Sequence, residues 1–353
     1  MILIKMTKSN SLLRLKTLTN KGCLCMLVLL LCGSLTLLAQ QKNYPVSITV
    51  ALDGSGDFKT IQEAVNSVRD LSQQKITIHI KAGIYHEKVV IPATKTKVFL
   101  QGDDAGNTVI SNADYSGKPI PGGKDESGRD KFSTFNSYTL LVRGNDFTAE
   151  SLTIENSAGR VGQAVALDVE ADRCVIRNCR LLGNQDTLYT GNDTSRQFYQ
   201  HCWIEGTTDF IFGSATAVFQ DCTVKSLANS YITAASTTPR QPYGYVFLNC
   251  RLIADAGITK VYLGRPWRPF ARVVYIECQM DNHIIPIGWH NWNNPENEKT
   301  AFYAEYNSKG DGARTEARVN WSKQLTADEA GKYTIANILS GSDNWKPLQD
   351  HGN

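Results

Sequence analysis

The sequence predicts an all-β chain wound into a right-handed parallel β-helix. A strand-like segment centred on a cysteine recurs along the chain, as in VIRNCRL around Cys179 and FYQHCWI around Cys202. Successive copies lie 20 to 28 residues apart, and no long amphipathic helical pattern separates them. Short β-rich units that recur at such a period are typical of a solenoid, in which each coil packs only on its neighbours.

The first forty residues differ from the rest of the chain. They contain five basic residues and no acidic one, and an 18-residue apolar run from Gly22 to Ala39 follows the basic part. This layout is typical of a secretory signal peptide, although the run is also near the lower limit for a membrane-spanning helix. Three small or polar residues dilute the run, and Ala39 offers a small residue for cleavage. We therefore expect residues 1–40 to direct export and residues 41–353 to form one domain outside the membrane.

The charge of the remaining chain says little about its partners. Five of the 37 basic residues lie in the first forty positions, so the rest carries 32 basic and 34 acidic residues, or about −2. No basic run interleaved with aromatic residues is present there, so nucleic-acid binding has no support. The hydrophobic share of 42% and the charged share of 20% are typical of a globular chain that can bury a large core.

Both ends of the repeat region carry helix-capping signatures. Thr60 and Glu63 precede an apolar pattern that predicts a short helix covering the N-terminal end of the solenoid. Near the C-terminus, Thr326 and Glu329 repeat the signature, and we expect a helical and loop segment to cover that end. The stretch 111–129 is rich in Gly, Pro, Lys and Asp, and it predicts a long loop that leaves one coil.

The repeat aligns on a column of cysteines. The aligned positions are Leu152, Cys179, Cys202, Cys222, Cys250 and Cys278. The residue two places after each cysteine is apolar, and the residue three places before it is Ile, Tyr or Phe. Equivalent positions of a parallel coil stack about 4.8 Å apart, so we expect a buried column of small apolar side chains. Disulfide or metal roles for these cysteines stay open at this point.

Two copies of the repeat continue into turns of the same pattern, GNQDTLY and GTTDFIF. Both place an aspartate seven residues after the cysteine, so Asp186 and Asp209 are predicted to lie one above the other, about 5 Å apart. Like charges at that distance repel by roughly 3 kcal/mol at an effective dielectric of 20, enough to separate the two pKa values by about two units. Such a pair suits a nucleophile beside a general acid/base, although Gly-x-x-Asp alone is ordinary turn chemistry.

Polar and aromatic residues near this pair extend the predicted site. Gln185 beside Asp186, and Gln163 one coil earlier, bring amide donors to the same face, as a developing oxyanion requires. Glutamine ladders also occur in solenoids as purely structural features. Arg265 in YLGRPW can hold a carboxylate ionised, and Trp267 can stack on a sugar ring. A proline turn with a packed tryptophan is the simpler interpretation of that motif alone.

Five motifs resemble, in the same order, the signatures of pectin methylesterases. They are GIYHE (83–87), QAVAL (163–167), GNQDTLY (183–189), GTTDFIFG (206–213) and YLGRPW (262–267). DGSGDFKTIQEAV near the start and FYAEY near the end also match, so the resemblance covers about residues 46–346. It implies a right-handed parallel β-helix that hydrolyses the methyl esters of pectin, without a metal or an organic cofactor. We expect such a protein to act as an exported monomer in the periplasm, at the cell surface or in the medium.

The resemblance implies a catalytic role for each matching polar residue. Asp209 is the expected nucleophile at the ester carbonyl. Asp186 is expected to protonate the departing methanol and then to activate water. Gln163 and Gln185 are the expected oxyanion donors, and Arg265 is expected to orient Asp209.

The resemblance also implies four substrate contacts, which are Trp267, Tyr189, Phe212 and Thr134. Tyr189 and Phe212 each follow an aspartate of the pair by three residues, and stacked core aromatics are the alternative interpretation of both. Tyr138 stands where the family usually has alanine, so the shape of the cleft near Thr134 is left open.

Four other functions compete with this one. A sister β-helix enzyme, such as a pectate lyase or polygalacturonase, is the first, but no dense acidic cluster suited to calcium stands beside the repeat. A related esterase or thioesterase acting on another acyl substrate is the second, because the same chemistry could serve it. A sugar-binding solenoid without activity would be expected to lack at least one of Asp186, Asp209 and Arg265. A Ser-His-Asp esterase is disfavoured, since no Gly-x-Ser-x-Gly motif is present.

Overall fold

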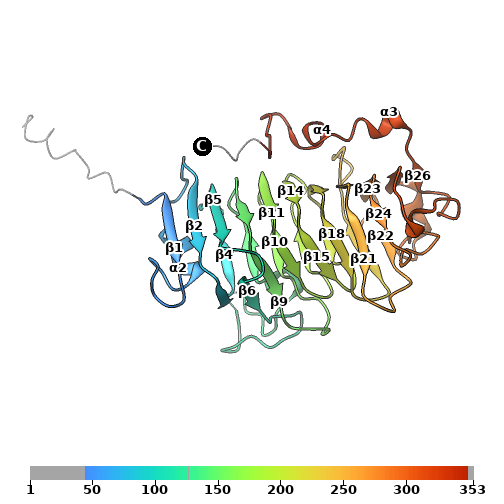
Figure 1. Ribbon diagram of the computed structural model, residues 1–353. Helices are drawn as coiled ribbons and strands as arrows, with labels where there is room; N and C mark the ends of the chain where they lie inside the picture. Colours follow the sequence, from blue (N-terminus) through green and yellow to red (C-terminus); the bar gives the residue numbers. More distant parts are fainter. Residues whose placement is uncertain (1–43, 126, 349–353) are drawn as a thin grey trace, which may run out of the picture. The chain divides into compact units, whose positions relative to one another are not determined.

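The computed structural model describes residues 44–125 and 127–348, and the predicted signal, residues 1–40, lies outside them. The described strands form three parallel sheets, which we call sheets A, B and C (Figure 1). Among the described residues, no helix has both the length and the apolar character needed to cross a membrane. The three parallel sheets confirm the predicted all-β solenoid.

Within each sheet, neighbouring strands are hydrogen-bonded in the following spatial order. Sheet A contains β1 (Ser47–Val50), β2 (Ile76–Ile80), β5 (Val98–Gly102), β8 (Thr148–Glu150), β11 (Cys174–Arg177), β14 (Arg196–Gln200), β17 (Thr216–Gln220), β20 (Tyr245–Leu248), β23 (Arg272–Ile276), β25 (Phe302–Tyr306) and β26 (Lys323–Gln324). Sheet B contains β3 (Gly83–His86), β6 (Thr108–Asn112), β9 (Thr153–Asn156), β12 (Arg180–Leu182), β15 (Trp203–Gly206), β18 (Thr223–Ser226), β21 (Arg251–Ala254) and β24 (Gln279–Met280). Sheet C contains β4 (Val89–Ile91), β7 (Leu140–Val142), β10 (Leu167–Val169), β13 (Leu188–Thr190), β16 (Ile211–Gly213), β19 (Tyr231–Ala235) and β22 (Tyr262–Pro266).

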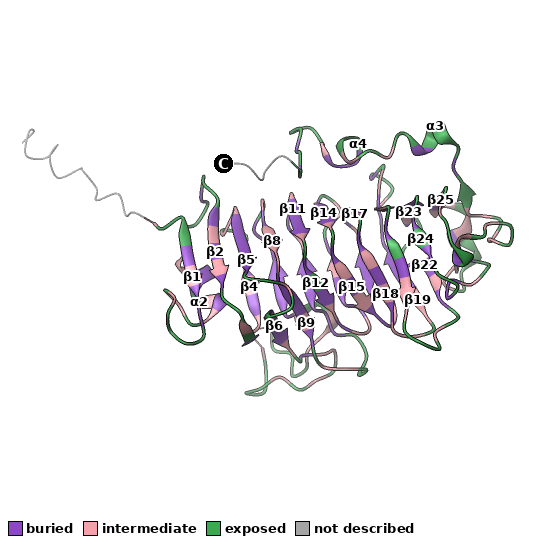
Figure 2. Cartoon of the chain, in the orientation of Figure 1, coloured by how far each residue is buried: buried purple, intermediate pink, exposed green. Residues whose placement is uncertain are grey.

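In the central part of the solenoid, each coil contributes one strand to every sheet. Strands β11, β12 and β13 make one coil, and β14, β15 and β16 make the next, which pairs with it strand by strand in parallel. Parallel neighbours need a long connection, and the other two strands of the coil supply it. Figure 2 shows the strands largely buried, whereas exposed residues gather in the connecting loops.

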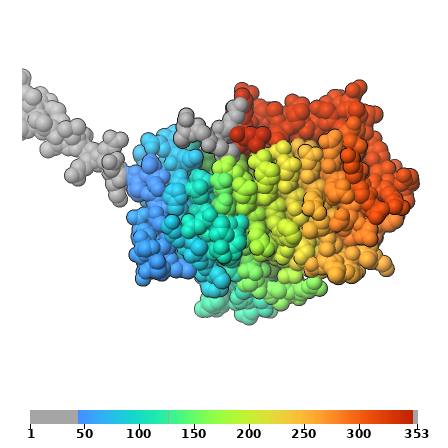
Figure 3. Space-filling model, in the orientation of Figure 1, coloured from blue at the N-terminus to red at the C-terminus, as the bar shows by residue number. Residues whose placement is uncertain are grey.

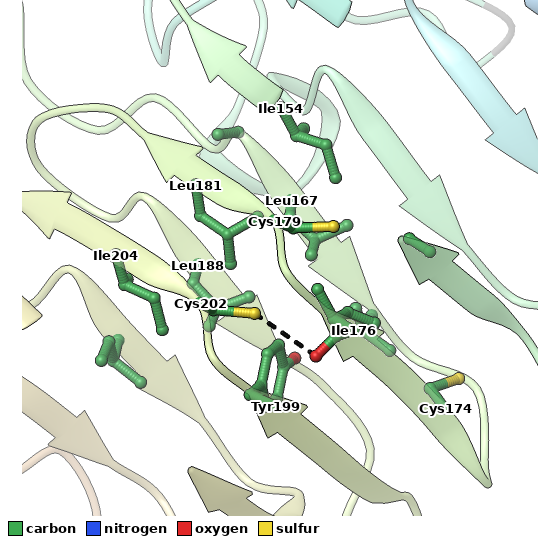
Figure 4. Close-up of a cluster of buried hydrophobic side chains, with 14 of the residues drawn as sticks. Ile154, Leu167, Cys174, Ile176, Cys179, Leu181, Leu188, Tyr199, Cys202 and Ile204 are labelled. Atoms are coloured by element: carbon green, nitrogen blue, oxygen red, sulfur yellow. Dashed lines mark hydrogen bonds between the residues drawn. The ribbon is translucent and has the colours of Figure 1, made fainter. Parts of the chain in front are cut away.

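The alignment of the repeats on their cysteines matches the strand register of sheet B. The residue after each cysteine pairs with the residue after the next one, from Arg180 in β12 to Gln279 in β24. All six described cysteines are buried and free. The Cys202 thiol donates to the carbonyl oxygen of Ile176, with Sγ and O 3.3 Å apart (Figure 4). The expected column of small apolar side chains is thus confirmed.

An aromatic column runs beside the cysteines, at the position three residues before them. The ring centroids are 4.7 Å apart for Tyr199 and Phe219, 4.5 Å for Phe219 and Phe247, and 4.4 Å for Phe247 and Tyr275. All four residues are buried. Because aromatic pairs of this kind add about 0.5–1.5 kcal/mol beyond their buried area, the column favours regular stacking of the coils that carry the site.

Helix α2 (Ile61–Ser67) begins where the capping signature predicts and buries Ile61, Ala64 and Val65 against the first coils. The Thr60 hydroxyl accepts a hydrogen bond from the Glu63 backbone N–H. The return bond of the capping box, from the Thr60 N–H to the Glu63 carboxylate, does not occur among the described residues. The Glu87 carboxylate accepts from the backbone N–H groups of residues 61 and 62, at 2.9 and 3.0 Å. A carboxylate from the GIYHE motif therefore satisfies the helix N-terminus, where negative charge is favourable.

The C-terminal segment contains helices α3 (Ala327–Ala330) and α4 (Ile335–Leu339), and α3 has the complete Thr326–Glu329 capping box. The predicted helical character is correct, but the expected position at the end of the coil is wrong. Ile338 and Leu339 pack on the outward-facing side chains of sheet A, such as Phe198. Figure 3 shows the segment lying along several coils. The outer face of sheet A carries apolar side chains, and the C-terminal segment removes them from water by covering them.

The loop predicted at 111–129 begins later than expected, because β6 extends to Asn112. Beyond that strand the chain folds back as a short ribbon, in which the Gly117 N–H donates to the Phe132 carbonyl and the Phe132 N–H donates to the Lys118 carbonyl. The Ser116 N–H donates to the carbonyl of Gln163 at 2.9 Å. The loop is therefore tied to the turn that carries one of the predicted oxyanion donors.

Candidate active site

The outer face of sheet C carries the candidate site. Its neighbouring strands pair in one register, which places the following residues in a single outward column: Val90, Leu141, Asp168, Tyr189, Phe212, Ala234 and Arg265. The residues on either side of them point into the core, as Leu167 and Val169 do around Asp168. The alternation of the strands thus directs Tyr189, Phe212 and Arg265 away from the core.

Asp186 and Asp209 occupy equivalent positions in adjacent turns, two residues before β13 and β16. The two residues are only 5% and 6% exposed. Both adopt left-handed backbone conformations, with φ of 66° and 50°. The Asp209 N–H donates to the carbonyl of Tyr231 at 2.8 Å, and the Asp186 N–H donates to the carbonyl of Thr208 at 3.1 Å. Neighbouring coils therefore fix two unusual backbone positions, which often mark functional residues.

Arg265 distinguishes the two aspartates. Its Nε and Nη2 donate to the two carboxylate oxygens of Asp209, at 2.9 and 2.6 Å. Burial raises the pKa of Asp186 to about 8, the charge of Asp209 adds to the shift, and Arg265 opposes it. The pKa of Asp209 is also raised by burial, but the hydrogen bond and the charge of Arg265 oppose this rise. The pair therefore has one carboxylate held by a bidentate cation and one carboxylic acid beside it.

The two glutamines lie on adjacent turns next to this pair. Gln163 and Gln185 form an isolated parallel bridge, and the Ala164 N–H donates to the Gln185 carbonyl at 3.0 Å. Gln163 is exposed and Gln185 is half-buried. Both therefore reach the surface near the aspartates, whereas the use of their amides as oxyanion donors stays a prediction.

Aromatic rings line the same face. The centroid of Tyr189 lies 4.9 Å from that of Phe212, which lies 6.0 Å from that of Trp267. These rings belong to a small apolar cluster with Val165 and Ala234, separate from the main core. Tyr189 and Trp267 are half-buried in this outer layer of sheet C, whereas Phe212 is only 4% exposed, so packing within the layer stays the alternative interpretation of Phe212. Contact with a substrate stays a prediction for each of them.

Thr134 opens a short 3₁₀-helix, η1 (Thr134–Asn136), at one border of this aromatic row. The next residue, Phe135, is 47% exposed, and its ring packs edge-on against Tyr189 with centroids 5.3 Å apart. Tyr138, which departs from the family pattern, is half-buried and joins the same cluster. Phe135 extends the row, and sequence reasoning missed it although it directly follows Thr134.

Sequence reasoning also missed the residues that surround Arg265. The guanidinium carbon lies 3.9 Å from the ring centroid of Tyr231 and 3.7 Å from that of Trp292. The imidazole of His290 lies near Tyr231, with ring centroids 5.4 Å apart. None of the three belongs to a family motif described above, so only the contacts of the folded chain reveal them. The sequence signal available was weak: two aromatic residues within the segment GWHNW.

No group of three or more His, Cys, Asp or Glu side chains suited to a metal ion occurs in residues 44–125 and 127–348. The charged groups that act on one another in the aspartate pair are Asp186, Asp209 and Arg265. The chemistry that these residues can carry out unaided is acyl transfer, with a carboxylate nucleophile and a carboxylic acid as proton donor.

Asp168 is a third buried carboxyl group on this face, and it lies outside the aspartate pair. It is completely buried, and neither carboxyl oxygen has a hydrogen-bond partner among the described residues. Burial, reinforced by the charge of Glu170, raises its pKa well above the usual value. A raised folded-state pKa gives stability that is complete below the unfolded pKa and lost as pH rises towards the folded one.

Asp168→Asn is therefore expected to flatten the pH dependence of stability. The melting temperatures of the variant and the parent should be similar near pH 4, and the variant should be the more stable at pH 8, because the amide cannot ionise. Thermal unfolding followed by circular dichroism over this pH range tests the prediction. A constant difference at all pH values would show that Asp168 is not held neutral by the fold.

The fold and the site together define a class of protein. A parallel β-helix with a buried aspartate pair, an arginine on one carboxylate and a flanking row of aromatic rings is the architecture of an ester hydrolase that acts on a sugar polymer. The pectinesterase family model matches residues 47–342, and the chain belongs to the pectinesterase family.

Known relatives agree with this assignment. Pectinesterase 31 from Arabidopsis thaliana is 40% identical over 288 residues, which cover 81% of this chain and 90% of the relative. The solved pectin methylesterase from carrot is 36% identical with a TM-score of 0.75, covering 84% of this chain and 93% of that one. A solved pectin methylesterase in complex with a hexasaccharide is 30% identical with a TM-score of 0.70, covering 85% and 98%. Some curated relatives, named as combined pectinesterase and pectinesterase inhibitor proteins, are longer, and the chain spans about half of their length.

These comparisons confirm the expected family, the right-handed parallel β-helix and the enzyme class. The chain is a pectinesterase-type ester hydrolase. The alternative of a related esterase or thioesterase on another acyl substrate is not favoured by them.

Proposed function

We propose that this protein removes methyl esters from pectin by acyl transfer to Asp209, with Asp186 as general acid and general base. The observation that carries the assignment is the bidentate contact of Arg265 with Asp209, beside an Asp186 whose pKa is raised to about 8. The first carboxylate is kept ionised and in a fixed plane, as a nucleophile needs to be. The second keeps its proton at neutral pH, as a general acid does.

The first half of the proposed reaction forms an acyl-enzyme. A carboxylate oxygen of Asp209 attacks the ester carbonyl carbon, and the carbonyl oxygen becomes an oxyanion. When this intermediate collapses, the bond from carbon to the methoxy oxygen breaks. Asp186 gives its proton to that oxygen, so methanol leaves and Asp186 becomes a carboxylate. The galacturonyl group is then held on Asp209 as an anhydride.

The second half regenerates the enzyme. The Asp186 carboxylate takes a proton from water, and the oxygen of that water attacks the galacturonyl carbonyl carbon. The bond to Asp209 breaks, which restores its carboxylate and leaves Asp186 protonated. The product is a galacturonic acid residue, which loses its proton to solvent.

Other residues of the face have supporting roles in this proposal. Gln163 and Gln185 donate amide hydrogen bonds to the oxyanion in both halves of the reaction. Trp267, Tyr189 and Phe212 offer ring faces on which sugar rings of the polymer can stack. Thr134 contributes a polar contact beside Phe135 at the border of the row.

We further propose that the protein acts outside the cytoplasm, as a monomer. The basic and then apolar character of residues 1–40 supports export. A polymeric substrate also requires an enzyme that meets it outside the cell. Secretion of the full chain, followed by N-terminal sequencing of the exported form, tests the signal, and light scattering of that form tests the monomer.

Incubation of the purified protein with highly methylated pectin tests the function. Methanol and unsaturated sugar products are assayed separately, with and without EDTA. We expect methanol release that EDTA does not change, and no unsaturated product. Unsaturated ends formed only in the absence of EDTA would identify a metal-dependent lyase and would refute the esterase proposal.

A further inference from the structure

The guanidinium of Arg265 is enclosed between two aromatic rings. Its carbon lies 3.9 Å from the ring centroid of Tyr231 on one side and 3.7 Å from that of Trp292 on the other. The bidentate contact with Asp209 occupies the edge of the same group. Both ring distances are well within the range of favourable cation–π contact.

The loop that carries Trp292 is held in an unusual conformation. Trp292 and Asn293 have positive φ values of 63° and 56°. A bulky residue rarely adopts this backbone region, so the surrounding contacts have to stabilise it. The Trp292 N–H donates to Nδ1 of His290 at 3.0 Å, and the His290 N–H donates to the carbonyl of Gly264 at 3.1 Å. These two bonds connect the loop to β22, the strand of Arg265.

Tyr231 connects the opposite side of the guanidinium to the nucleophile. Its carbonyl accepts the Asp209 N–H at 2.8 Å, while its ring contacts Arg265. The ring is itself stacked on Tyr262, with centroids 4.9 Å apart. One residue therefore fixes both members of the ion pair, Asp209 through the main chain and Arg265 through the side chain.

We infer that Tyr231 and Trp292 are positioning residues that hold the Arg265 guanidinium in bidentate contact with Asp209, and that His290 anchors Trp292. The inference rests on the proposed role of Asp209. An arginine side chain has many rotamers, and a partly exposed one exchanges its partners for water. Two aromatic faces restrict the rotamers of the side chain and exclude water from the faces of the cation. Only the edge of the guanidinium is then left for a carboxylate.

Steady-state kinetics on methylated pectin separate positioning from substrate binding. Trp292→Ala and Tyr231→Ala are expected to lower kcat roughly 10- to 100-fold while KM changes less than about threefold. Trp292→Phe and Tyr231→Phe keep a ring face and should recover most of kcat. A rise in KM with kcat unchanged would make these residues substrate contacts and would overturn the inference.

Trp203→Ala is the matched control. Trp203 lies on sheet B, and its ring also carries a cation, with Lys225 Nζ 5.8 Å from the centroid. Trp203→Ala removes a partly buried tryptophan and its cation contact, but it should leave kcat unchanged because Trp203 lies on a different sheet from the site. An equal loss of kcat in this control would assign the effect at Trp292 to general destabilisation and would contradict the inference.

A titration gives a readout that does not depend on activity. In the Asp186→Asn background, the charged group that still acts on Asp209 is Arg265. The pKa of Asp209, followed by ¹³C NMR of labelled aspartates and assigned with an Asp209→Asn spectrum, should rise when Trp292→Ala is added. An unchanged pKa would refute the positioning role. A parent protein inactive on pectin would refute the proposed function instead, and this titration would still report on Arg265.

The anchoring role of His290 is tested by two substitutions, His290→Asn and His290→Ala, which differ in whether the side chain can accept the Trp292 N–H. Asparagine at 290 can still accept the Trp292 N–H, because Asn side chains commonly accept the backbone N–H two residues on, whereas alanine cannot. We expect His290→Ala to lower kcat in the same direction as Trp292→Ala, and His290→Asn to recover most of the loss. Equal losses in the two variants would exclude the anchoring role of His290.

Discussion

Asp209→Asn is expected to lower kcat for methanol release from methylated pectin by about 10⁴-fold or more. The amide is a poor nucleophile, and it cannot accept two hydrogen bonds from Arg265 in the way that both carboxylate oxygens do. The loss should fall on kcat rather than on KM, because the aromatic row that is proposed to bind the sugar chain is untouched. Initial rates of methanol formation over a range of pectin concentrations provide the measurement.

Asp221→Asn is a matched control for this variant. Asp221 has a similar left-handed backbone, with φ of 53°, but it is exposed and lies in the turn between β17 and β18, away from sheet C. Its substitution should leave kcat unchanged. Methanol release by Asp209→Asn at more than a few per cent of the parental rate would mean that another group attacks the ester.

Asp186→Asn is expected to lower kcat about 10²- to 10⁴-fold, the usual range for a general acid/base. The pH profile carries the sharper expectation. Methanol departure requires protonated Asp186, whose pKa is about 8, so the parental rate should fall as pH rises through that value. The residual activity of the variant should lack this fall, because its amide does not titrate there.

Stability provides the control for Asp186→Asn. The folded-state pKa of Asp186 lies above its ordinary value, so the parent loses stability as pH rises towards 8, and the variant should not. A melting temperature at pH 8 at or above that of the parent would show that the lost activity is not lost folding. A parental rate that stays constant between pH 7 and 9 would contradict the role of Asp186 as the acid.

Much of the fold could be predicted because each sequence repeat forms one coil, and consecutive coils stack on one another. The cysteine alignment matched the register of sheet B, and counting forward from it placed Asp186 over Asp209 without any long-range information. A solenoid permits this because each coil meets only the coils before and after it, so contacts in space follow the spacing in sequence. The N-terminal helix was predictable for a related reason, since its cap and its apolar face are local.

Contacts between distant segments could not be predicted in this way. The C-terminal helix was recognised from its capping box, but its position on sheet A depends on outward side chains such as Phe198, which lie far earlier in the sequence. Glu87 accepts a backbone N–H of the first turn of helix α2 from 25 residues away, and the local capping signature gave no sign of this contact. In both cases several partners were chemically suitable, and packing of the whole chain selected one.

The amino-acid sequence alone was enough to specify the solenoid, the buried column of cysteine side chains, the pairing of Asp186 with Asp209 and, through the family motifs, the choice of Arg265. These features rest on period, on residue type and on short-range spacing, which a linear chain displays directly. The folded chain was needed to show that Arg265 makes its bidentate contact with Asp209 and that Tyr231 and Trp292 enclose its guanidinium. An ion pair and a cation–π contact depend on where the ends of side chains lie, which the period of the repeat does not specify. Trp292 in addition lies in a loop that follows no repeat.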